Sequence, residues 1–392
     1  MNTKAKKTLI IVIIVLVLIL AGLLVYYFFF KKPTTPTGPG GVLPEPGTGI
    51  EPGTGIEPGT GIPKSALKIK AISNEPVFSP TTTADKNQVI YYTRTNGNIW
   101  QSDFDGTNLN RVSDINLESL ILTLWSPNKD STITVFEDAL GNISKYLYEL
   151  QNEKTIQLNK YTNYVVWSPD GKKIAYQYQN DFTGENTLSV SDPNGSNYTI
   201  YLKTRMKNLK LDWPKGNELF FQEKPSGIVT SSLYSLNLGT KTFNRASSDV
   251  YGLSVKWSPD GSKMLYSKTA QNGKNPGLYV VGRIMTNPKT VGVATLVEKC
   301  AWSQDIRYVY CAVPKNITEA EVLPDDFYKG TFASNDDFLK INLETGETTK
   351  LLDSSLMIET YDANDVFLSL NENYFFFVNK VNGLLYSIKL SE

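Results

Sequence analysis

The segment from Pro314 to Asp337 gathers several side chains that could do chemistry. Its carboxylates come from Glu319, Glu321, Asp325–Asp326 and Asp336–Asp337. Two carboxylates roughly 5 to 9 Å apart can act as the acid and base of glycoside hydrolysis, so a carboxylate-based glycan-active enzyme is one hypothesis. Within the same segment, Asp325, Asp326, Phe327 and Tyr328 place acids beside aromatic rings, which favours a contact patch for a partner. The alternative is a neutral excursion packed against its own structural unit.

Other catalytic chemistries are excluded by composition. The chain of 392 residues has no histidine, which rules out a Ser-His-Asp triad, a Cys-His dyad and a histidine-rich zinc site. Its two cysteines, Cys300 and Cys311, cannot form a zinc site alone. We therefore expect no metal, no cofactor and no enzymatic activity.

The charge balance argues against nucleic acid as a partner. Lys plus Arg and Asp plus Glu both number 39, so there is no basic excess. Arginine, the residue suited to bidentate phosphate contacts, is scarce along the chain. We expect a protein or peptide partner instead.

A repeated motif indicates the architecture that must position these residues. The pentapeptide Trp-Ser-Pro-Asp-Gly occurs at 167–171 and again at 257–261, and weaker copies begin at Trp125, Trp213 and Trp302. The successive tryptophans are 42, 46, 44 and 45 residues apart. A period in this range is typical of four-stranded units arranged as a β-propeller. Because the tryptophans hold equivalent positions, we expect Trp125, Trp167, Trp213, Trp257 and Trp302 to pack between blades rather than to form a ligand-stacking ring.

Two further units lack the tryptophan and set the number of blades. One begins at Val77 and the other at Phe367, and the second ends one strand short. The stretch Leu67–Ile72 alternates apolar and polar residues as a strand does. We predict that it supplies the missing outer strand, because a propeller must hide the edges of its first and last blades. The prediction is an all-β fold with seven blades; six is the alternative.

The motif resembles the TolB-type propeller repeat. The similarity rests on Trp-Ser-Pro-Asp-Gly-x-x-Ile/Met-x-Tyr and on outer turns such as Ser102–Asn108, and it extends over about residues 66–392. The repeat also occurs in the propellers of prolyl-oligopeptidase-like peptidases, but no hydrolase domain follows here. The resemblance implies a propeller that binds proteins or peptides on one face. The N-terminal region departs from soluble TolB.

The cysteine pair lies within one predicted blade. Cys300 falls on the first strand of the sixth unit and Cys311 on its second. The segment 314–337 is predicted to be an insertion between the second and third strands of the same unit. If the intervening turn centres on Asp305-Ile306, the two residues face each other across the strands. They form either a disulfide or two buried thiols.

The N-terminal region predicts attachment to a membrane. Residues 8–30 carry no charge over 23 positions, long enough for one transmembrane helix, and no signal-peptidase-like site follows them. Lysines favour a short cytoplasmic N-terminus at residues 1–7. Residues 31–65 contain three Glu-Pro-Gly-Thr-Gly-Ile repeats and predict a disordered linker.

Together these features predict a single-pass membrane protein of the cell envelope. Its propeller, residues 66–392, would lie outside the cytoplasm, in a periplasmic or extracellular space. The expected function is non-catalytic binding of a protein, a peptide or an envelope polymer. The alternatives are an envelope scaffold or sensor and the glycan-active enzyme.

Overall fold

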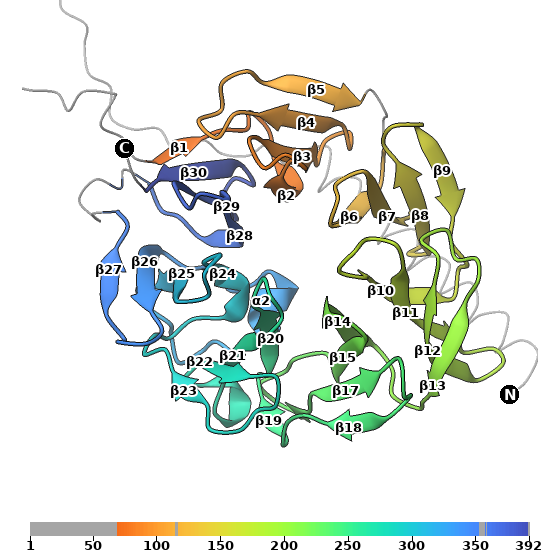
Figure 1. Ribbon diagram of the computed structural model, residues 1–392. Helices are drawn as coiled ribbons and strands as arrows, with labels where there is room; N and C mark the ends of the chain where they lie inside the picture. The colour runs from red at the N-terminus through yellow and green to blue at the C-terminus, as the bar shows by residue number, and fades with distance from the viewer. Residues whose placement is uncertain (1–68, 114–116, 353–356, 358, 391–392) are drawn as a thin grey trace, which may run out of the picture. The chain divides into compact units, whose positions relative to one another are not determined.

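Seven four-stranded antiparallel sheets are arranged as blades around an axis in the computed structural model (Figure 1). The structure describes residues 69–113, 117–352, 357 and 359–390. The predicted transmembrane helix at 8–30 and the predicted linker at 31–65 lie outside the described residues. Within the described ranges, no helix has both the length and the apolar character needed to cross a membrane.

The blades follow one another along the chain, each with its first strand nearest the axis (Figure 1). Blades one to three consist of β2 (Val77–Thr82), β3 (Val89–Thr93), β4 (Ile99–Ser102) and β5 (Asn110–Ser113); β6 (Leu120–Trp125), β7 (Ser131–Glu137), β8 (Ile143–Glu149) and β9 (Lys154–Gln157); and β10 (Thr162–Trp167), β11 (Ile174–Asn180), β12 (Glu185–Ser191) and β13 (Thr199–Lys203). Blades four and five consist of β14 (Leu209–Lys215), β15 (Glu218–Glu223), β17 (Tyr234–Asn237) and β18 (Phe243–Arg245); and β20 (Ser254–Trp257), β21 (Lys263–Lys268), β22 (Gly277–Gly282) and β23 (Lys289–Thr290). Blades six and seven consist of β24 (Cys300–Trp302), β25 (Tyr308–Pro314), β26 (Asp336–Asn342) and β27 (Thr348–Lys350); and β28 (Ala363–Leu368), β29 (Tyr374–Asn379), β30 (Leu385–Lys389) and β1 (Ile69–Ala71). We call the four strands of each blade A to D in this order.

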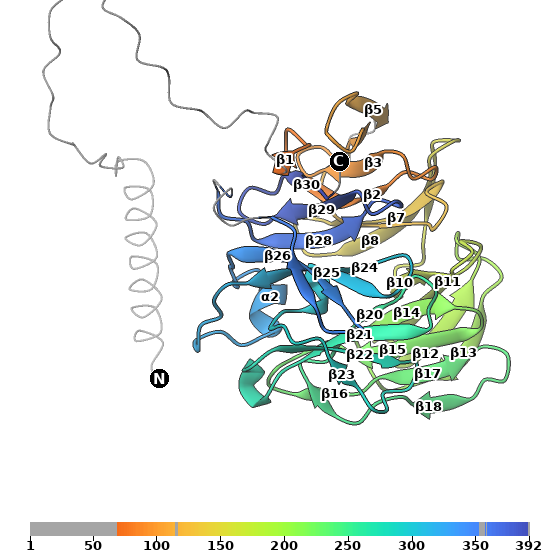
Figure 2. The same ribbon diagram turned by 60° about the vertical axis from the view of Figure 1, so that its left-hand side comes forward.

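The two ends of the propeller meet in blade seven. Strand β1 pairs antiparallel with β30, and Ile69 lies opposite Ile388. Both ribbon views show β1 beside β30 (Figures 1 and 2). The prediction that a strand preceding blade one completes blade seven is confirmed, and so is the prediction of seven blades rather than six.

Apolar side chains hold neighbouring blades together. Each of the seven interfaces between blades has its own buried cluster, including the one between blades one and seven. The motif tryptophans lie in these clusters, one at each interface from blades one and two to blades five and six. The indole N–H of Trp125, for example, donates to the carbonyl of Ser79 in blade one at 2.9 Å, and that of Trp167 donates to Leu124 in blade two at 2.9 Å. The motif tryptophans thus pack between neighbouring blades.

The Ser-Pro-Asp-Gly residues form the turns between strands A and B. In blade three, Ser168 Oγ donates to Asp170 Oδ1 at 2.7 Å and accepts from the backbone N–H of Lys173 at 2.9 Å. Gly171 has a φ of +70°, a conformation that favours glycine. Ser258, Asp260 and Lys263 repeat these contacts in blade five. The aspartates are therefore fully used by turn geometry.

The cysteine pair joins strands A and B of blade six. Cys300 lies directly opposite Cys311 in the register of β24 and β25. The two sulfurs are bonded, with the Cα atoms 4.1 Å apart. Both residues are fully buried in the interface with blade five, so the link lies inside the propeller.

Candidate binding face

The loops that join strand B to strand C lie at one end of the propeller, together with the segments that enter each strand A. We call this end the B–C face. In blade six its loop runs from 315 to 335 and contains the short helix α2 (Asp325–Lys329). This is the insertion that the sequence places between strands B and C, and we keep that name for residues 315–335. Its four candidate binding residues all lie on α2.

The two aspartates of α2 hold backbone groups of the protein. Asp325 accepts hydrogen bonds from Ser226 Oγ at 2.9 Å and from the backbone N–H of Gly227 at 2.7 Å, both in blade four. Asp326 accepts from the backbone N–H of Val322 at 2.7 Å. Hydrogen bonds to an ionised carboxylate are stronger than neutral ones. The acids therefore fasten the insertion.

The two aromatic residues of α2 also point inward. Phe327 is buried in a cluster with Leu296, Leu323 and Phe332. The hydroxyl of Tyr328 bonds with Ser254 Oγ at 3.0 Å and donates to Glu298, and burial raises its pKa well above the ordinary range. The four residues lie in contacts within the protein rather than in an outward patch. Nor does the insertion pack only against its own blade, since it contacts blades four and five.

Backbone bonds connect the B–C loops of three successive blades. The N–H of Gly273 in blade five donates to the carbonyl of Gly227 in blade four at 3.0 Å, and the N–H of Leu323 in blade six donates to the carbonyl of Gly273 at 3.2 Å. Lys274 adds bonds from Nζ to the carbonyls of Glu319 and Glu321. We call these three joined loops the clamped half of the B–C face.

The paired carboxylates suggested for glycan chemistry are separated by the fold. Asp336 is fully buried and accepts from Lys299 Nζ at 2.8 Å. Asp337, the next residue of β26, forms ion pairs with Lys315 and Lys350 instead, because successive side chains of a strand point to opposite sides. Glu321 accepts from the backbone N–H of Thr318. Asp336 and Asp337 are therefore engaged with different cations.

A buried ion cluster beneath the clamped half was not anticipated from the sequence. Lys299 is fully buried, and its Nζ lies 2.8 Å from Asp336 Oδ2, 2.8 Å from Asp362 Oδ1 and 3.0 Å from Ser334 Oγ. It also donates to the carbonyl of Ala363 at 2.8 Å. The cluster ties blade six and its insertion to blade seven.

The other half of the B–C face holds an open pocket. Its volume is about 650 Å³, and it extends from the mouth of the central channel over blades two, three and four. Four large side chains that line it are exposed to solvent: Ile121, Leu122, Ile143 and Tyr164. Leu124, Val135, Val165 and Leu211 continue this apolar lining. We call this cavity the channel-mouth pocket.

Polar groups stand at a few points around the channel-mouth pocket. Lys145 donates from Nζ to Asn163 at 3.1 Å, Lys210 donates to the carbonyl of Val255 at 3.0 Å, and Lys224 is exposed. Glu298 and Tyr328 complete the wall on the side of the clamped half. The pocket thus combines a mainly apolar surface with three amines and one carboxylate, as ligand sites commonly do.

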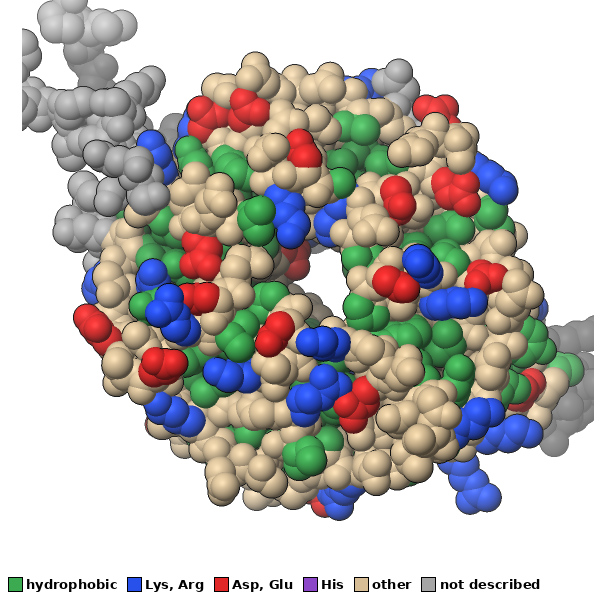
Figure 3. Space-filling model, in the orientation of Figure 1, with side chains coloured by type: hydrophobic (Ala, Val, Ile, Leu, Met, Phe, Trp, Pro, Cys, Tyr) green, Lys and Arg blue, Asp and Glu red, His purple; other side chains and the backbone are tan. Residues whose placement is uncertain are grey.

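The pocket continues into the channel along the axis. Lys210 and Glu298 also line a second cavity of about 460 Å³, with Asp212, Lys256 and Asp365. Figure 3 shows the opposite face of the propeller, where basic and acidic side chains surround the other opening of the channel. Burial raises the pKa of Asp212, although Lys210 opposes this, and burial lowers the pKa of Lys256 to about 8.

Two carboxylate oxygens in the channel remain available as acceptors. Within the described ranges, Asp212 Oδ2 and Glu298 Oε2 have no hydrogen-bond partner. The acids are nevertheless spread out: in the part of the chain that the structure describes, no group of three or more His, Cys, Asp or Glu side chains could hold a metal ion. Both oxygens are buried in the channel wall, where their capacity to accept a hydrogen bond is unused.

Exposed apolar side chains also occupy the B–C loops of blades two, three and four. Leu140 in blade two is 88% exposed, and Phe182 in blade three is 96% exposed. Ile228 and Val229 are exposed in the loop of blade four. These side chains share a face with the channel-mouth pocket, so the apolar surface available there exceeds the pocket itself.

Sequence reasoning missed the channel-mouth pocket, although a local signal exists. The first strand of blade two, β6, reads Leu-Ile-Leu-Thr-Leu-Trp, with apolar residues on both sides of the strand. Its register shifts between Leu120 and Leu122, and Ile121 and Leu122 both remain exposed. Loss of alternation in a strand that borders a channel is the signal that could have identified the site.

No protein-family model and no curated protein matches the sequence. Among solved structures, an oligogalacturonate lyase in complex with manganese has a TM-score of 0.59 at 12% identity, covering 83% of this chain and 93% of its own. The oligogalacturonate lyase of Vibrio parahaemolyticus gives 0.58 at 11% identity, covering 84% and 95%. The β-propeller domain of Myceliophteria thermophila Cps50 gives 0.53 at 10% identity, covering 82% and 100%.

TolB of Acinetobacter baumannii has a TM-score of 0.45 at 13% identity, covering 71% of this chain and 64% of its own. The likeness to TolB therefore rests on the repeat motif. At identities this low, the similar structures show a shared β-propeller fold, which serves both enzymes and other proteins, and no particular activity.

Proposed function

We propose that this chain is a membrane-anchored, extracytoplasmic binding module without catalytic activity. Its ligand is a protein or peptide segment that inserts an apolar side chain into the channel-mouth pocket. The observation that carries the proposal is the group of exposed apolar side chains around that pocket, namely Ile121, Leu122, Ile143 and Tyr164. Soluble surfaces rarely keep contiguous apolar patches without an interaction to use them.

The size and lining of the pocket support this ligand class. A volume of about 650 Å³ lies within the range of roughly 300–1,000 Å³ typical of ligand pockets. The amines of Lys145 and Lys224 favour a carboxylate on the ligand, while Glu298 Oε2 favours an N–H donor. A peptide with an apolar side chain next to an acidic one satisfies both.

The first described residue of the propeller lies away from the proposed site. Ile69 pairs with Ile388 near the end of β30 that is remote from the B–C loop of blade seven. The anchor itself is supported by the 23 uncharged residues at 8–30.

Selection of random displayed peptides against the full-length chain in detergent micelles tests the proposal. We expect enrichment of peptides that combine an apolar residue with Asp or Glu, and loss of their binding in a Leu122→Asp variant. Ile284→Asp is the matched control, because Ile284 is exposed in the C–D loop of blade five, at the opposite face. Peptide binding that survives Leu122→Asp, or that is lost in Ile284→Asp, contradicts the proposed site. Turnover of a bound compound by the purified chain contradicts the proposed lack of catalysis.

A further inference from the structure

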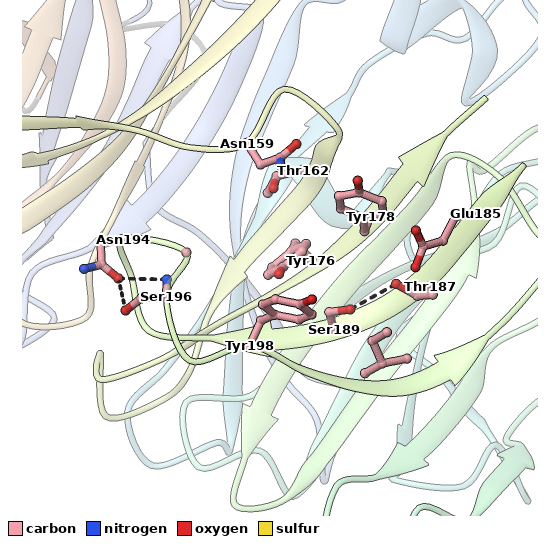
Figure 4. A pocket seen from close by; sticks show the side chains of 12 residues that line it. Asn159, Thr162, Tyr176, Tyr178, Glu185, Thr187, Ser189, Asn194, Ser196 and Tyr198 are labelled. Carbon is pink, nitrogen blue, oxygen red and sulfur yellow. Dashed lines mark hydrogen bonds between the residues drawn. The ribbon is translucent and has the colours of Figure 1, made fainter. Parts of the chain in front are cut away.

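A separate groove lies on the flank of blade three that faces blade two (Figure 4). Its volume is about 410 Å³, and it shares no lining residue with the channel-mouth pocket. Tyrosine rings, hydroxyl groups and amides make up most of its surface. We propose that this groove, which we call the tyrosine groove, binds a neutral saccharide chain. The proposal is independent of the peptide site on the B–C face.

The groove exists because blade three has small residues where blade four has large ones. In blade four, Phe221 pairs with Tyr234 across strands B and C, and their rings stack with centroids 5.5 Å apart. In blade three, the corresponding Tyr176 pairs with Ser189. Two residues along the strand, blade four pairs Leu219 with Leu236, whereas blade three pairs Ile174 with Ser191. Ser189, which lines the groove, leaves open the space that Tyr234 fills in blade four.

Three tyrosines give the groove aromatic walls. Tyr176 and Tyr178 are two apart on β11, so both point to the same side of the sheet, and Tyr198 stands just before β13 (Figure 4). Tyr198 is 64% exposed. Exposed tyrosine rings provide apolar faces with a polar tip. The C–H faces of a pyranose ring have the shape and character to pack against such rings.

The remaining walls can exchange hydrogen bonds with hydroxyl groups. Thr187 Oγ1 and Ser189 Oγ lie 3.0 Å apart and keep further bonding capacity. Asn194 Oδ1 accepts from Ser196, and no bond from the Asn194 amide nitrogen occurs among the described residues (Figure 4). Because every sugar hydroxyl both donates and accepts, such a mixed set suits a saccharide.

The charge of the groove favours a neutral saccharide as its ligand. Glu185 is the one charged side chain that lines the groove among the described residues, and no hydrogen bond or ion pair of its carboxylate occurs in the same ranges. The hydroxyls of Tyr178 and Tyr198 likewise have no protein hydrogen-bond partner in the ranges described. A carboxylate without a neighbouring cation repels acidic polymers but accepts sugar hydroxyls strongly. A neutral saccharide therefore fits better than an acidic one.

The test uses the full-length chain in detergent micelles and an array of neutral glycans that includes cellotetraose and tetra-N-acetylchitotetraose. We expect retention of at least one neutral glycan, followed by saturation-transfer NMR signals from its ring C–H protons. Tyr198→Ala removes an exposed ring and should weaken binding roughly tenfold. Ser189→Tyr places in blade three the side chain that closes the corresponding space in blade four, and should abolish binding while the melting temperature is retained.

Ile284→Ala is the matched control, because Ile284 is also 64% exposed but lies in blade five. It should leave glycan binding unchanged. Failure of every neutral glycan to bind overturns the proposal. So does binding that is insensitive to both Tyr198→Ala and Ser189→Tyr, or a preference of the tyrosine groove for peptides or acidic glycans.

Discussion

On the B–C face, the loops of blades four, five and six are bonded to one another, whereas no backbone bond joins those of blades two and three within the described ranges. The clamped half uses two carboxylates, two glycines and a buried ion cluster to hold its loops. The open half displays Leu140 and Phe182 around the channel-mouth pocket. The comparison shows that charged loop residues can hold neighbouring loops together. The exposed surface beside the channel-mouth pocket is mainly apolar.

The physical reason lies in how polar and apolar groups gain stability. A loop of 21 residues in blade six must satisfy its own backbone groups, and acidic side chains do this well because they accept strong hydrogen bonds from N–H groups. An apolar side chain at a loop tip does not stabilise the fold while it is exposed to water. It contributes favourable free energy when another surface covers it. Composition of a loop alone therefore does not reveal whether it binds a partner.

The largest expected effect tests whether the ion cluster holds the clamped half. Replacing Lys299 by Met leaves Asp336 buried without a cation and Asp362 with only its longer ion pair to Lys380, and should lower the free energy of unfolding by about 3–5 kcal/mol. Urea unfolding followed by circular dichroism measures the change. Lys173→Met, which removes a solvent-exposed ion pair with Asp192, is the control and should cost about 1 kcal/mol or less. Equal losses of unfolding free energy in the two variants would show that the buried cluster contributes no more to stability than an exposed ion pair.

A smaller effect is expected where the clamped loops touch. A Cβ on Gly227 would lie 2.3 Å from Gly273 Cα and 2.4 Å from the carbonyl oxygen of Leu323. Both are backbone atoms, so Gly227→Ala must push the loops apart, at a cost of roughly 1–3 kcal/mol. Hydrogen exchange should then become faster in the insertion.

Gly282→Ala is the control for this change, because a Cβ there meets nothing within 4 Å. It should leave both the free energy of unfolding and hydrogen exchange in the insertion near their original values. If Gly227→Ala behaves as Gly282→Ala does, the contact among the three loops is looser than the structure indicates.

On the open half, the comparison predicts that ligand binding and stability respond separately. Leu122 is exposed, so Leu122→Asp should change the free energy of unfolding by no more than about 0.5 kcal/mol. The same variant should lose the peptides selected against the original chain. Thermal unfolding and peptide binding measured on one preparation check both. A large loss of stability would show that the open half, too, is structural.

A pH dependence of stability is expected at the channel between the two halves. Burial lowers the pKa of Lys256 from 10.5 to about 8, so between these values the unfolded chain binds the proton more strongly than the folded one. The contribution of Lys256 to stability should therefore increase as pH rises from about 8 to 10.5. The difference in unfolding free energy between the original chain and Lys256→Met should rise across this window. A difference in unfolding free energy that does not change with pH would contradict the lowered pKa of Lys256 in the folded chain.

Much of the fold could be predicted because its signals are local and repeated. In the third unit, alternation and turn residues predict strands at 164–167, 173–179, 187–191 and 198–202, and the structure places β10 to β13 within two residues of these bounds. Turn residues such as Asp170 act through contacts a few positions away. The closing strand at Ile69–Ala71 was predictable for a different reason, since blade seven otherwise lacks its fourth strand.

The candidate site could not be predicted to the same extent. The insertion was located correctly between strands B and C, but its Asp325 and Tyr328 bond with partners that lie 30 to 99 residues earlier in the chain, namely Ser226, Gly227, Ser254 and Glu298. Partners at such separations leave no pattern within the loop itself. The tyrosine groove was missed for a similar reason. It depends on Ser189 being smaller than Tyr234, the residue at the corresponding position of the neighbouring blade.

By itself, the sequence determined a ring of four-stranded blades, the places of the motif tryptophans and the strand that joins the two ends. These follow from strand alternation, turn chemistry and a repeat of about 44 residues, all of which act over short distances along the chain. Only the tertiary structure decided which loops are fastened, which apolar side chains stay exposed and where cavities open. Those properties depend on residues brought together from different blades, and packing between blades is a property of pairs that no single segment encodes.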